Sequence, residues 1–540
     1  MKQNNDHSED EAGESGKKVY LVGGGITSLA AAVFLIRDAN VLGHNITILE
    51  ELDRLGGSLD GTGSPHEGYV LCGGRMLESK CLCTYDLFSS IPTLDQTMTV
   101  TKEIFDWNET TKMSSQSRLV RAGQRESAPA FGLSEKHIFT LKRLMVEPEE
   151  RFGKDGIADQ FDPEFFVTNF WLMWCTTFAF QPWHSAMEFK RCLLRFTHML
   201  EGFNQLHGIM GTVYNHYDSM VRPLQKWLEA RGVCFALNTR VKNLVSRKNA
   251  AGKRVERIVC EHNRRTREIT VGADDLVIVT LGSRTEASSL GSMEVAPVLN
   301  DETDGGRWAL WEKIAAGRPE FGRPSAFAGH VDESKSVSFT TTLRDPTFFR
   351  LVRGITGNVP GEGGLVTLAN SSWLASIVLP HQPHFIGQPK DVDVFWGYGL
   401  SVDKPGDFVK KPMHACTGRE IMTEIMGHLR IETEASHVLA TATCIPCMMP
   451  FFTSQFLRRK KGDRPHVIPK GWTNLAFTGQ FCELPDDVVF TIEYSIRSAM
   501  AAVYRLLDLK LKPPPVYQGQ YDPHILSRAF AALHNTGASE

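Results

Sequence analysis

The feature that most constrains the fold is a glycine turn between a buried strand and a helix near the N-terminus. Residues 18–23 (KVYLVG) predict a buried strand, and the Ala-rich residues 29–37 predict a helix. Between them, Gly23, Gly25 and Ser28 have the spacing of a dinucleotide-binding turn, with a small residue in place of the third glycine. Such glycines let the backbone approach a pyrophosphate, which the N–H groups of the helix N-terminus bind. This arrangement predicts a Rossmann-type domain.

The next predicted strand supplies an acidic residue for the same site. It covers residues 46–49 and ends at Glu50, which Glu51 follows. A carboxylate at this place accepts hydrogen bonds from ribose hydroxyls. Because Glu50 lies somewhat beyond the usual distance of about 20 residues, the loop over residues 39–45 must be longer than usual.

Three further features favour FAD over NAD as the cofactor. A second glycine turn follows the acid and consists of Gly56, Gly57 and Ser58. Residues 274–283 (DDLVIVTLGS) predict a buried strand that ends in a turn of small residues. Residues 474–480 (NLAFTGQ) have a strand-then-glycine pattern where many flavoproteins carry Gly-Asp against the ribityl chain, with Gln480 in place of the Asp. Asp486 and Asp487 then precede a helix predicted over Val488–Met500, since acids suit a helix N-terminus.

The predicted fold class is α/β, with a discontinuous Rossmann-type FAD-binding domain, because the distant C-terminal strand must join the N-terminal strands. Its predicted segments are residues 17–100, 225–290 and 470–508. A mixed α+β substrate-binding region is predicted for residues 101–224 and 291–469, in which 101–155 form a connecting region and 156–228 are helical. Residues 1–16 are predicted to be a disordered acidic tail, and 509–540 a helical C-terminal segment.

Composition excludes some classes of partner and location. The formal net charge of -3 gives no basic field for nucleic acid. The N-terminus is polar, without the apolar stretch of a signal peptide, so the 11 cysteines are expected to be reduced thiols in the cytoplasm. Cys444 and Cys447 form a CxxC pair, but Pro446 lies inside it and no second pair follows at a suitable spacing. We expect buried thiols there and no metal.

Two apolar segments leave a membrane or lipid role open. The uncharged run Phe165–Phe180 is shorter than a transmembrane helix, so we expect a core helix that also forms a wall of an apolar ligand tunnel. Near the C-terminus, Asp522 is a predicted helix cap and Pro523 the first residue of a helix with one apolar stripe. This helix either docks on the body of the protein or forms an interfacial lid that meets membrane lipid, in which case the protein is peripheral at the membrane.

Distinctive stretches occur along most of the chain. They include residues 48–61 (ILEELDRLGGSLDG), 73–94 (GGRMLESKCLCTYDLFSSIPTL), 214–219 (YNHYDS), 381–385 (HQPHF), 396–400 (WGYGL), 411–418 (KPMHACTG) and 479–495 (GQFCELPDDVVFTIEYS). In content and order they resemble the oleate hydratases, the fatty acid hydratases of the myosin-cross-reactive antigen family. The resemblance implies an FAD-binding hydro-lyase that adds water to the cis double bond of an unsaturated long-chain fatty acid, without net redox change.

A long acyl chain is a reasonable ligand for such an apolar protein. Burial of about sixteen methylenes supplies on the order of 13 kcal/mol before ordering losses. Thr441 and Thr443 precede an apolar Met-Met-Pro segment and are candidate donors to the carboxylate head. The expected cofactor-binding residues are Gly23, Gly25, Ser28, Glu50, Glu51, Gly56, Gly57, Ser58, Gly74, Arg75, Met76, Gly479, Gln480, Phe481, Phe490 and Thr491.

The chain departs from the family pattern at two positions that the resemblance would make catalytic. Met76 stands where the family's GGRE segment has a Glu that positions or activates water, and Cys192 aligns with the family's catalytic Tyr. Glu78 is the nearest carboxylate in sequence, and we expect an apolar pocket to raise its pKa toward neutrality. Tyr214 is a candidate proton donor.

Two other functions stay open at this point. A flavin-dependent oxidoreductase on an apolar substrate would share the FAD domain and would change the redox state of the flavin during turnover. An inactive relative would bind fatty acid without converting it, which would account for Met76 and Cys192. The sequence does not determine the oligomeric state.

Overall fold

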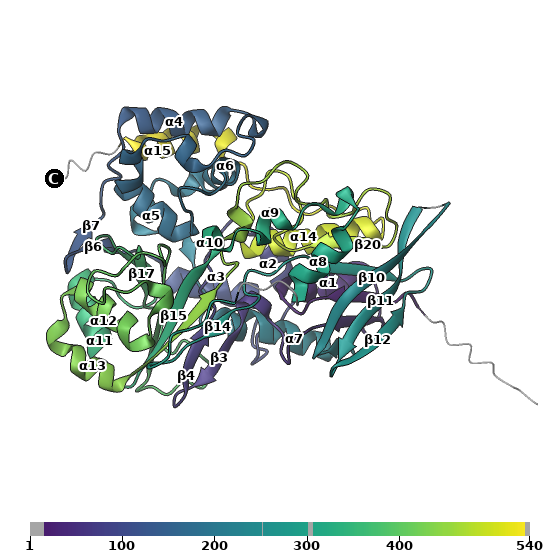
Figure 1. Ribbon diagram of the computed structural model, residues 1–540, viewed down its shortest axis with the longest axis horizontal. Helices are drawn as coiled ribbons and strands as arrows, with labels where there is room; N and C mark the ends of the chain where they lie inside the picture. The colour runs from purple at the N-terminus through teal and green to yellow at the C-terminus, as the bar shows by residue number, and fades with distance from the viewer. Residues whose placement is uncertain (1–15, 251, 301–305, 535–540) are drawn as a thin grey trace, which may run out of the picture.

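The computed structural model describes residues 16–250, 252–300 and 306–534, so the predicted acidic tail lies almost wholly outside it. Two sheets lie side by side along the long axis of the molecule, one of five strands and one of eight (Figure 1). A helical layer that includes α4 (Glu135–Val146) and α15 (Pro523–Leu533) lies above the eight-stranded sheet in this view. The predicted α/β class is confirmed.

The five-stranded sheet is parallel throughout and unites segments that are far apart in the chain. Its strand order is β20 (Leu475–Thr478), β13 (Leu276–Thr280), β1 (Val19–Val22), β2 (Ile46–Leu49) and β9 (Cys234–Ala236). Central strands of a parallel sheet are covered on both faces, which is why they are continuous apolar runs. The strands predicted from residues 18–23, 46–49, 274–283 and 474–480 are therefore confirmed.

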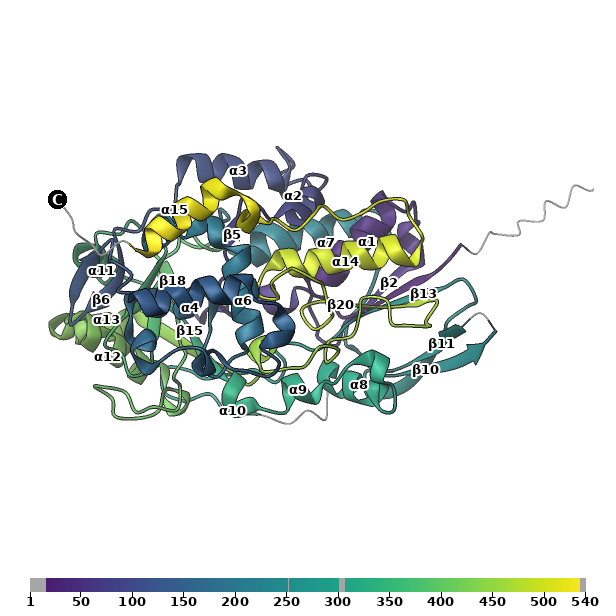
Figure 2. The same cartoon turned by 90° about the horizontal axis from the view of Figure 1, so that it is seen from above.

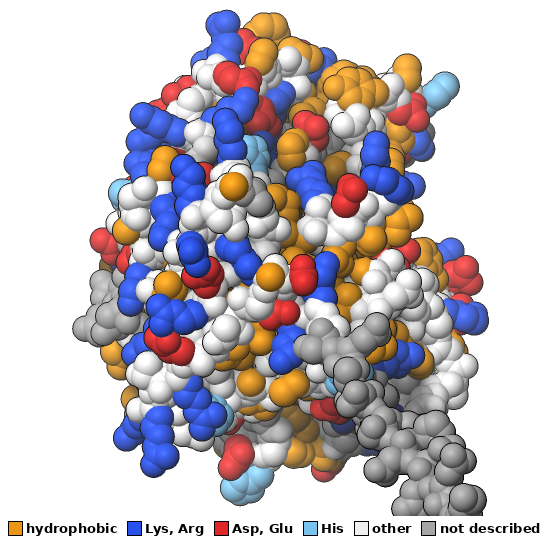
Figure 3. Space-filling view, turned by 90° about the vertical axis from the view of Figure 1, so that its right-hand side faces the viewer, with side chains coloured by type: hydrophobic (Ala, Val, Ile, Leu, Met, Phe, Trp, Pro, Cys, Tyr) orange, Lys and Arg blue, Asp and Glu red, His pale blue; other side chains and the backbone are white. Residues whose placement is uncertain are grey.

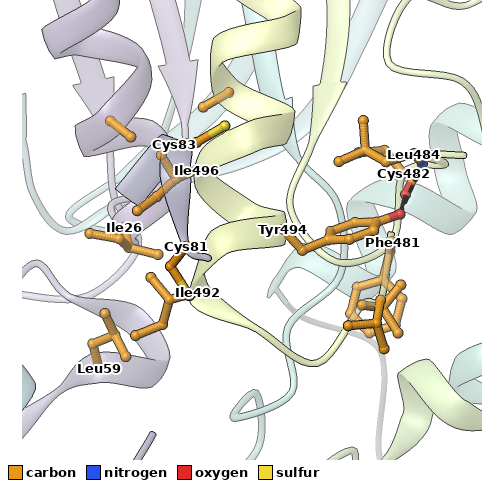
Figure 4. Close-up of a cluster of buried hydrophobic side chains, with 14 of the residues drawn as sticks. Ile26, Leu59, Cys81, Cys83, Phe481, Cys482, Leu484, Ile492, Tyr494 and Ile496 are labelled. Carbon is orange, nitrogen blue, oxygen red and sulfur yellow. Dashed lines mark hydrogen bonds between the residues drawn. The ribbon is translucent and has the colours of Figure 1, made fainter. Parts of the chain in front are cut away.

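Helices α1 (Ile26–Arg37) and α14 (Ile492–Leu506) lie next to each other beside this sheet (Figure 2). One face of α14 presents Ile492 and Ile496 toward Cys81 and Cys83, at the start of α2 (Leu82–Phe88), as Figure 4 shows. On its other face the Tyr494 hydroxyl donates to the carbonyl of Cys482 at 2.7 Å and accepts the N–H of Leu484 at 2.9 Å.

The start of α14 differs from the prediction. The helix begins at Ile492 and not at Val488, because the Thr491 side chain accepts the N–H of Tyr494 and caps it. Asp487, which was expected to favour the helix N-terminus, forms an ion pair with Arg497 further along the helix, at 3.1 Å.

A three-stranded antiparallel sheet and one further helix extend the five-stranded sheet. The strands are β10 (Thr239–Asn249), β11 (Gly252–His262) and β12 (Arg265–Thr270), and the helix is α8 (Gly306–Ala315). The sequence analysis placed α8 in the substrate-binding region. In the structure it packs against β10, and its Arg307 reaches Glu50 of the five-stranded sheet.

The eight-stranded sheet is mostly antiparallel and has its own hydrophobic core. Its order is β14 (Ser289–Leu290), β19 (Ala442–Met449), β15 (Ser336–Leu343), β18 (Asp393–Gly399), β17 (Ala375–Val378), β16 (Leu365–Leu368), β6 (Ser117–Arg121) and β7 (Gln124–Ser127). The second core contains side chains of α11 (Thr347–Thr356), α12 (Gly418–Leu429) and α13 (Ala435–Thr441). Because β6 and β7 are strands of this sheet, the prediction that residues 101–155 only connect other elements is wrong.

Short elements complete the chain. The two-stranded sheets are β3 (Gly61–Ser64) with β4 (Gly68–Leu71), and β5 (Leu77–Glu78) with β8 (Ile209–Met210). The remaining helices are α3 (Val100–Thr110), α5 (Asn169–Phe178), α6 (Ala186–Arg195), α7 (Arg222–Glu229), α9 (Ser325–Ala328) and α10 (Val331–Ser334). All residues of α5 except Asn169 are buried, which confirms the core helix predicted in this segment.

The C-terminal helix α15 begins as predicted. The Asp522 side chain accepts N–H groups of the first turn, and Pro523 is the first helical residue. Ala529 and Leu533 are buried, and Lys142 of α4 lies 4.7 Å from the centre of the Phe530 ring, so α15 docks on the helical layer. Within the described part of the chain, no helix combines the length and hydropathy that crossing a bilayer requires.

Charge is mixed on the surface. On the face shown in Figure 3, Lys and Arg side chains are interspersed with Asp and Glu.

Cys444 and Cys447, the CxxC pair, are buried free thiols in β19, as expected.

One buried ion-pair cluster joins the helical layer to the long segment before β20. Glu188 of α6 is fully buried and accepts from Arg459 at 2.8 Å and from Arg464 at 2.7 Å. The two arginines are each 1% exposed, so their charges depend on this carboxylate inside the core. Removing one partner of a buried pair leaves an uncompensated charge.

Replacing Glu188 by alanine is expected to lower the free energy of unfolding by about 3–5 kcal/mol, because Arg464 loses its ion-pair partner in the core. Urea denaturation followed by tryptophan fluorescence measures the change. Glu150→Ala, which removes the exposed partner of Lys461, is the matched control and should leave the midpoint almost unchanged. Equal losses in the two variants would contradict this role for Glu188.

Candidate functional site

Two glycine turns meet at the N-terminus of α1. Gly25 is the N-cap residue of α1 and offers no side chain to its free N–H groups. The N–H of Gly56 donates to the carbonyl of Gly24 at 3.0 Å, which fixes the second turn against the first. A Cβ at Gly57 would lie 3.3 Å from the Cα of Gly25, and Gly57 has a φ of 55°, so this position favours glycine. The open helix end is suited to a phosphate.

The acidic residue after β2 is buried beside this turn. Glu50 is 2% exposed, and its carboxylate accepts the N–H of Gly24 and, at 2.8 Å, the Nη2 of Arg307. Glu51 instead forms an ion pair with Arg240 of β10 at 2.5 Å. No local pattern in the sequence indicates Arg307, because only the tertiary structure brings α8 to this turn.

The other predicted cofactor residues lie at the ends of neighbouring elements. Ser28 is buried in the first turn of α1, with its Oγ 3.3 Å from the Oγ1 of Thr280 at the end of β13. Gly479 follows β20 with a φ of 90°. The Gln480 amide lies 3.5 Å from the carbonyls of Phe490 and Thr491.

Two predicted residues have other surroundings. Ser58 lies half-buried in a short 3₁₀ turn over Gly57–Leu59, after the second glycine turn. Phe481 is 2% exposed and packs against Trp308, Trp311 and Phe327. Phe481 therefore stabilises the position of α8.

The loop Gly73–Met76 lies against β18 of the eight-stranded sheet and is held at both ends. Before it, the N–H groups of Tyr69 and Leu71 in β4 donate to threonine side chains of β15 at 2.8 and 3.0 Å. After it, β5 pairs with β8. A Cβ at Gly74 would lie 2.2 Å from the Trp396 ring of β18, so this position requires glycine.

Two adjoining cavities share this loop. The larger encloses about 110 Å³ and the smaller about 40 Å³, and both are lined by Gly73, Gly74, Arg75, Met76 and Trp396. The apolar lining of the larger includes Leu59, Leu71, Trp107, Met113, Met210, Val378 and Leu379. Thr176, Thr177 and Ala179 line the smaller, so the segment around α5 does form a cavity wall, as predicted.

The larger cavity also contains a few polar side chains. Besides Arg75, they are Asp60, Asn108, Thr111, Thr212, Asn215, His216, His381 and His384. Burial lowers the pKa of His216 and of His384 to about 3, so both imidazoles are neutral at physiological pH.

Two arginines in this region, the buried Arg284 and the half-buried Arg75, have no carboxylate partner among the described residues. Arg284, 4% exposed, donates its Nε to the carbonyl of Phe452 at 2.8 Å, while its Nη1 and Nη2 have no partner among the described residues. Its guanidinium lies 4.7 Å from the ring centre of Phe452 and 5.8 Å from that of Phe490. Arg75 bonds only to carbonyls of its own loop and also leaves a nitrogen unpaired.

Burial lowers the pKa of both arginines, that of Arg75 to about 10. Two neighbouring buried charges without counter-charges are costly unless an anionic group joins them. The buried Oε1 of Gln480 also has no partner in the described part of the chain. These unpaired groups, together with the open N-terminus of α1, fit the predicted FAD, which offers both an anion and hydrogen-bonding ring atoms.

The expectation that the pKa of Glu78 is raised is wrong. Burial by itself would raise it, but the hydrogen bond to His198 and the charge of Arg195, whose Nη2 lies 2.6 Å away, lower the pKa to about 2. The carboxylate also accepts the N–H of Lys80 at 2.7 Å and is 3% exposed. Glu78 lines neither of the two cavities and is held as a structural anion.

The other predicted catalytic and substrate residues also lie away from the cavity lining. Tyr214 is half-buried near the larger cavity, but Asn215 and His216 line it instead. Thr441 ends α13, and the Thr443 hydroxyl accepts from Arg344 at 3.0 Å. The proton-donor and carboxylate roles therefore stay predictions.

Cys192 in α6, the residue that aligns with the family's Tyr, is fully buried, and burial raises the pKa of its thiol.

Fold and site together define an α/β protein of Rossmann type with a mainly apolar cavity beside its second glycine turn. The model of the MCRA family matches residues 16–504. An oleate hydratase from Streptococcus pyogenes serotype M49 (strain NZ131) is 38% identical, over 97% of this chain and 90% of that protein. A linoleate hydratase from Lactiplantibacillus plantarum is 31% identical, over 95% of this chain and 97% of that protein. The chain belongs to the MCRA family.

A similarity to a solved structure supports the fold alone. Putrescine oxidase bound to putrescine aligns with a TM-score of 0.52 and 12% identity, over 91% of this chain and 99% of that one.

Replacing Arg284 by methionine is expected to raise the melting temperature of the cofactor-free protein, because a buried unpaired charge is removed, and to weaken FAD binding at least tenfold. Differential scanning fluorimetry and FAD titration measure the two effects. The control is Arg118→Met, since Arg118 is equally buried but donates to three carbonyls and Thr177. That variant should lose stability and keep its FAD affinity. Loss of stability in Arg284→Met would contradict the assignment.

Proposed function

We propose that this chain is an FAD-binding hydratase that adds water to the cis double bond of an unsaturated long-chain fatty acid such as oleate. The observation that best supports this proposal is how much of the chain is similar to an oleate hydratase. The similarity spans 97% of the chain at 38% identity and so includes the cavity walls as well as the glycine turns. A relative that shared only cofactor binding would match only the Rossmann-type segments.

FAD is proposed to bind with its pyrophosphate at the N-terminus of α1, between the two glycine turns, and its ribose at Glu50. The flavin end would lie near Gln480 and the start of α14, where Arg75 and Arg284 provide positive charge. When bound, FAD would supply a fixed polar surface beside the reacting double bond. The chain's own residues bind and orient the substrate and restrict the access of water.

The acyl chain is proposed to occupy the two adjoining cavities. Their rings and aliphatic side chains exclude bulk water from the double bond, and each buried methylene contributes roughly 0.8 kcal/mol. The carboxylate head is proposed to lie toward Thr441 and Thr443, where the guanidinium of Arg344 adds a cation. A cytoplasmic location is also proposed, supported by the free thiols of its cysteines, with α15 as a surface for peripheral membrane contact.

The protein incubated with FAD, a reductant and oleate in ¹⁸O-labelled water is expected to yield a hydroxystearate with one ¹⁸O atom, seen by mass spectrometry. Stearate serves as the control, because without a double bond it should remain unchanged. Unconverted oleate that still binds would favour an inactive lipid-binding relative. An oxidised product with turnover of the flavin would identify an oxidoreductase and would contradict the proposal.

A further inference from the structure

The loop that borders both cavities carries a thioether where the family pattern has a carboxylate. Met76 lines the larger cavity and can neither take a proton from water nor hold water by charge. Because Glu78 is held by Arg195 and lines neither cavity, it does not replace the missing group. If the proposed hydration takes place in this cavity, another side chain must hold the water.

Among the residues that line the larger cavity, Asp60 is the single carboxylate. It follows the 3₁₀ turn Gly57–Leu59, just after the second glycine turn. Its Oδ2 forms an ion pair with Arg54 at 2.8 Å, so the side chain has a fixed orientation. Its Oδ1 is buried and has no hydrogen-bond partner among the described residues. Met76 and Trp396 line the same cavity.

Buried carboxylate oxygens nearly always have a partner or a bound water. Of the five described carboxylates with an unpaired buried oxygen, Asp60 is the one that lines the larger cavity. Burial raises the pKa of Asp60, against the lowering effects of the Arg54 charge and of the backbone N–H of Gly61. This brings the acid closer to the range in which proton transfer with water is effective. The neutral imidazoles of His216 and His384 lie on the same cavity and add hydrogen-bonding capacity without charge.

We propose that the free Oδ1 of Asp60 holds the attacking water and takes its proton, in the role that the family's Glu has at the position of Met76. This inference rests on the proposed function. In the addition, the π bond breaks as one carbon takes a proton from a hydronium ion in the cavity water. The other carbon bonds to the oxygen of the water that Asp60 holds. That water releases a proton to the carboxylate, which returns it to the cavity water, so water and alkene give the alcohol without other reactants.

The first test is Asp60→Asn, which keeps the shape and removes the base. We expect kcat for hydration to fall at least 100-fold, within the range typical of a lost general base, with FAD and oleate affinities changed less than threefold. Asp53→Asn is the matched control, because Asp53 is exposed in the same loop; it should retain activity. Hydration by Asp60→Asn at more than a third of the wild-type rate would overturn the proposal.

A second variant separates chemistry from folding. Adding Met76→Glu to Asp60→Asn returns a carboxylate to the same cavity. The double variant should have a kcat at least tenfold higher than that of Asp60→Asn. If Asp60→Asn fails to fold, the pH dependence of kcat in Arg54→Gln tests the role of Asp60 instead. Removing the Arg54 charge raises the pKa of Asp60, so the acid limb of the kcat profile should move to higher pH. An unmoved limb would contradict the role of Asp60.

Replacing any other charged or titratable group near Asp60 is expected to shift the acid limb of the kcat profile less than Arg54→Gln does. These groups are Asp53, Cys72, Arg75, Tyr217, His216 and His384. The two proposals fail differently. Wild-type protein without hydration would contradict the proposed function, whereas active wild type with an equally active Asp60→Asn would contradict only the role of Asp60.

Discussion

Parallel pairing of β1 with β13, and of β13 with β20, is the constraint on which the rest of the structure depends. Val19 pairs with Leu276 and Val277 with Leu475, so the paired residues are 257 and 198 positions apart. Gly23, Gly282 and Gly479 follow the carboxyl ends of these three strands. The intervening chain must leave this sheet and return to it. Part of it forms a second sheet with its own core, and the larger cavity lies where β17 and β18 of that sheet meet the segment after the second glycine turn.

The loop Gly73–Met76 has a fixed position at this interface. It is fixed by hydrogen bonds from β4 to β15 on one side and by pairing of β5 with β8 on the other. The closeness of Trp396 to Gly74 leaves no room for a side chain there. A loop held in this way can present Arg75 and Met76 to both cavities at once, which a free surface loop could not do.

Charge at this interface is arranged in two ways. Glu188 and Glu78 are buried with arginines close by and are fixed as anions, which stabilises the fold. Arg284 is buried without a carboxylate partner, and the half-buried Asp60, although paired with Arg54, lines the larger cavity with its Oδ1 unpaired. The second arrangement costs stability, and such a cost is typical of sites that complete their hydrogen bonds with a ligand. Asp60 lines the larger cavity and Glu78 does not, which directs attention to Asp60.

The sequence by itself determined the Rossmann-type strands, the glycine turns, the acid at Glu50 and the family, because these depend on local apolar runs and short fixed spacings. Tertiary structure decided which carboxylate lies in the cavity and which is paired. Glu78 is nearer to Met76 in sequence, but Arg195 binds it; Asp60 is 16 residues away and lines the same cavity. Arg284 and Arg307 were likewise found only in the fold. Ion pairs and cavity walls form between segments that are distant in the chain, and local sequence patterns do not predict such contacts.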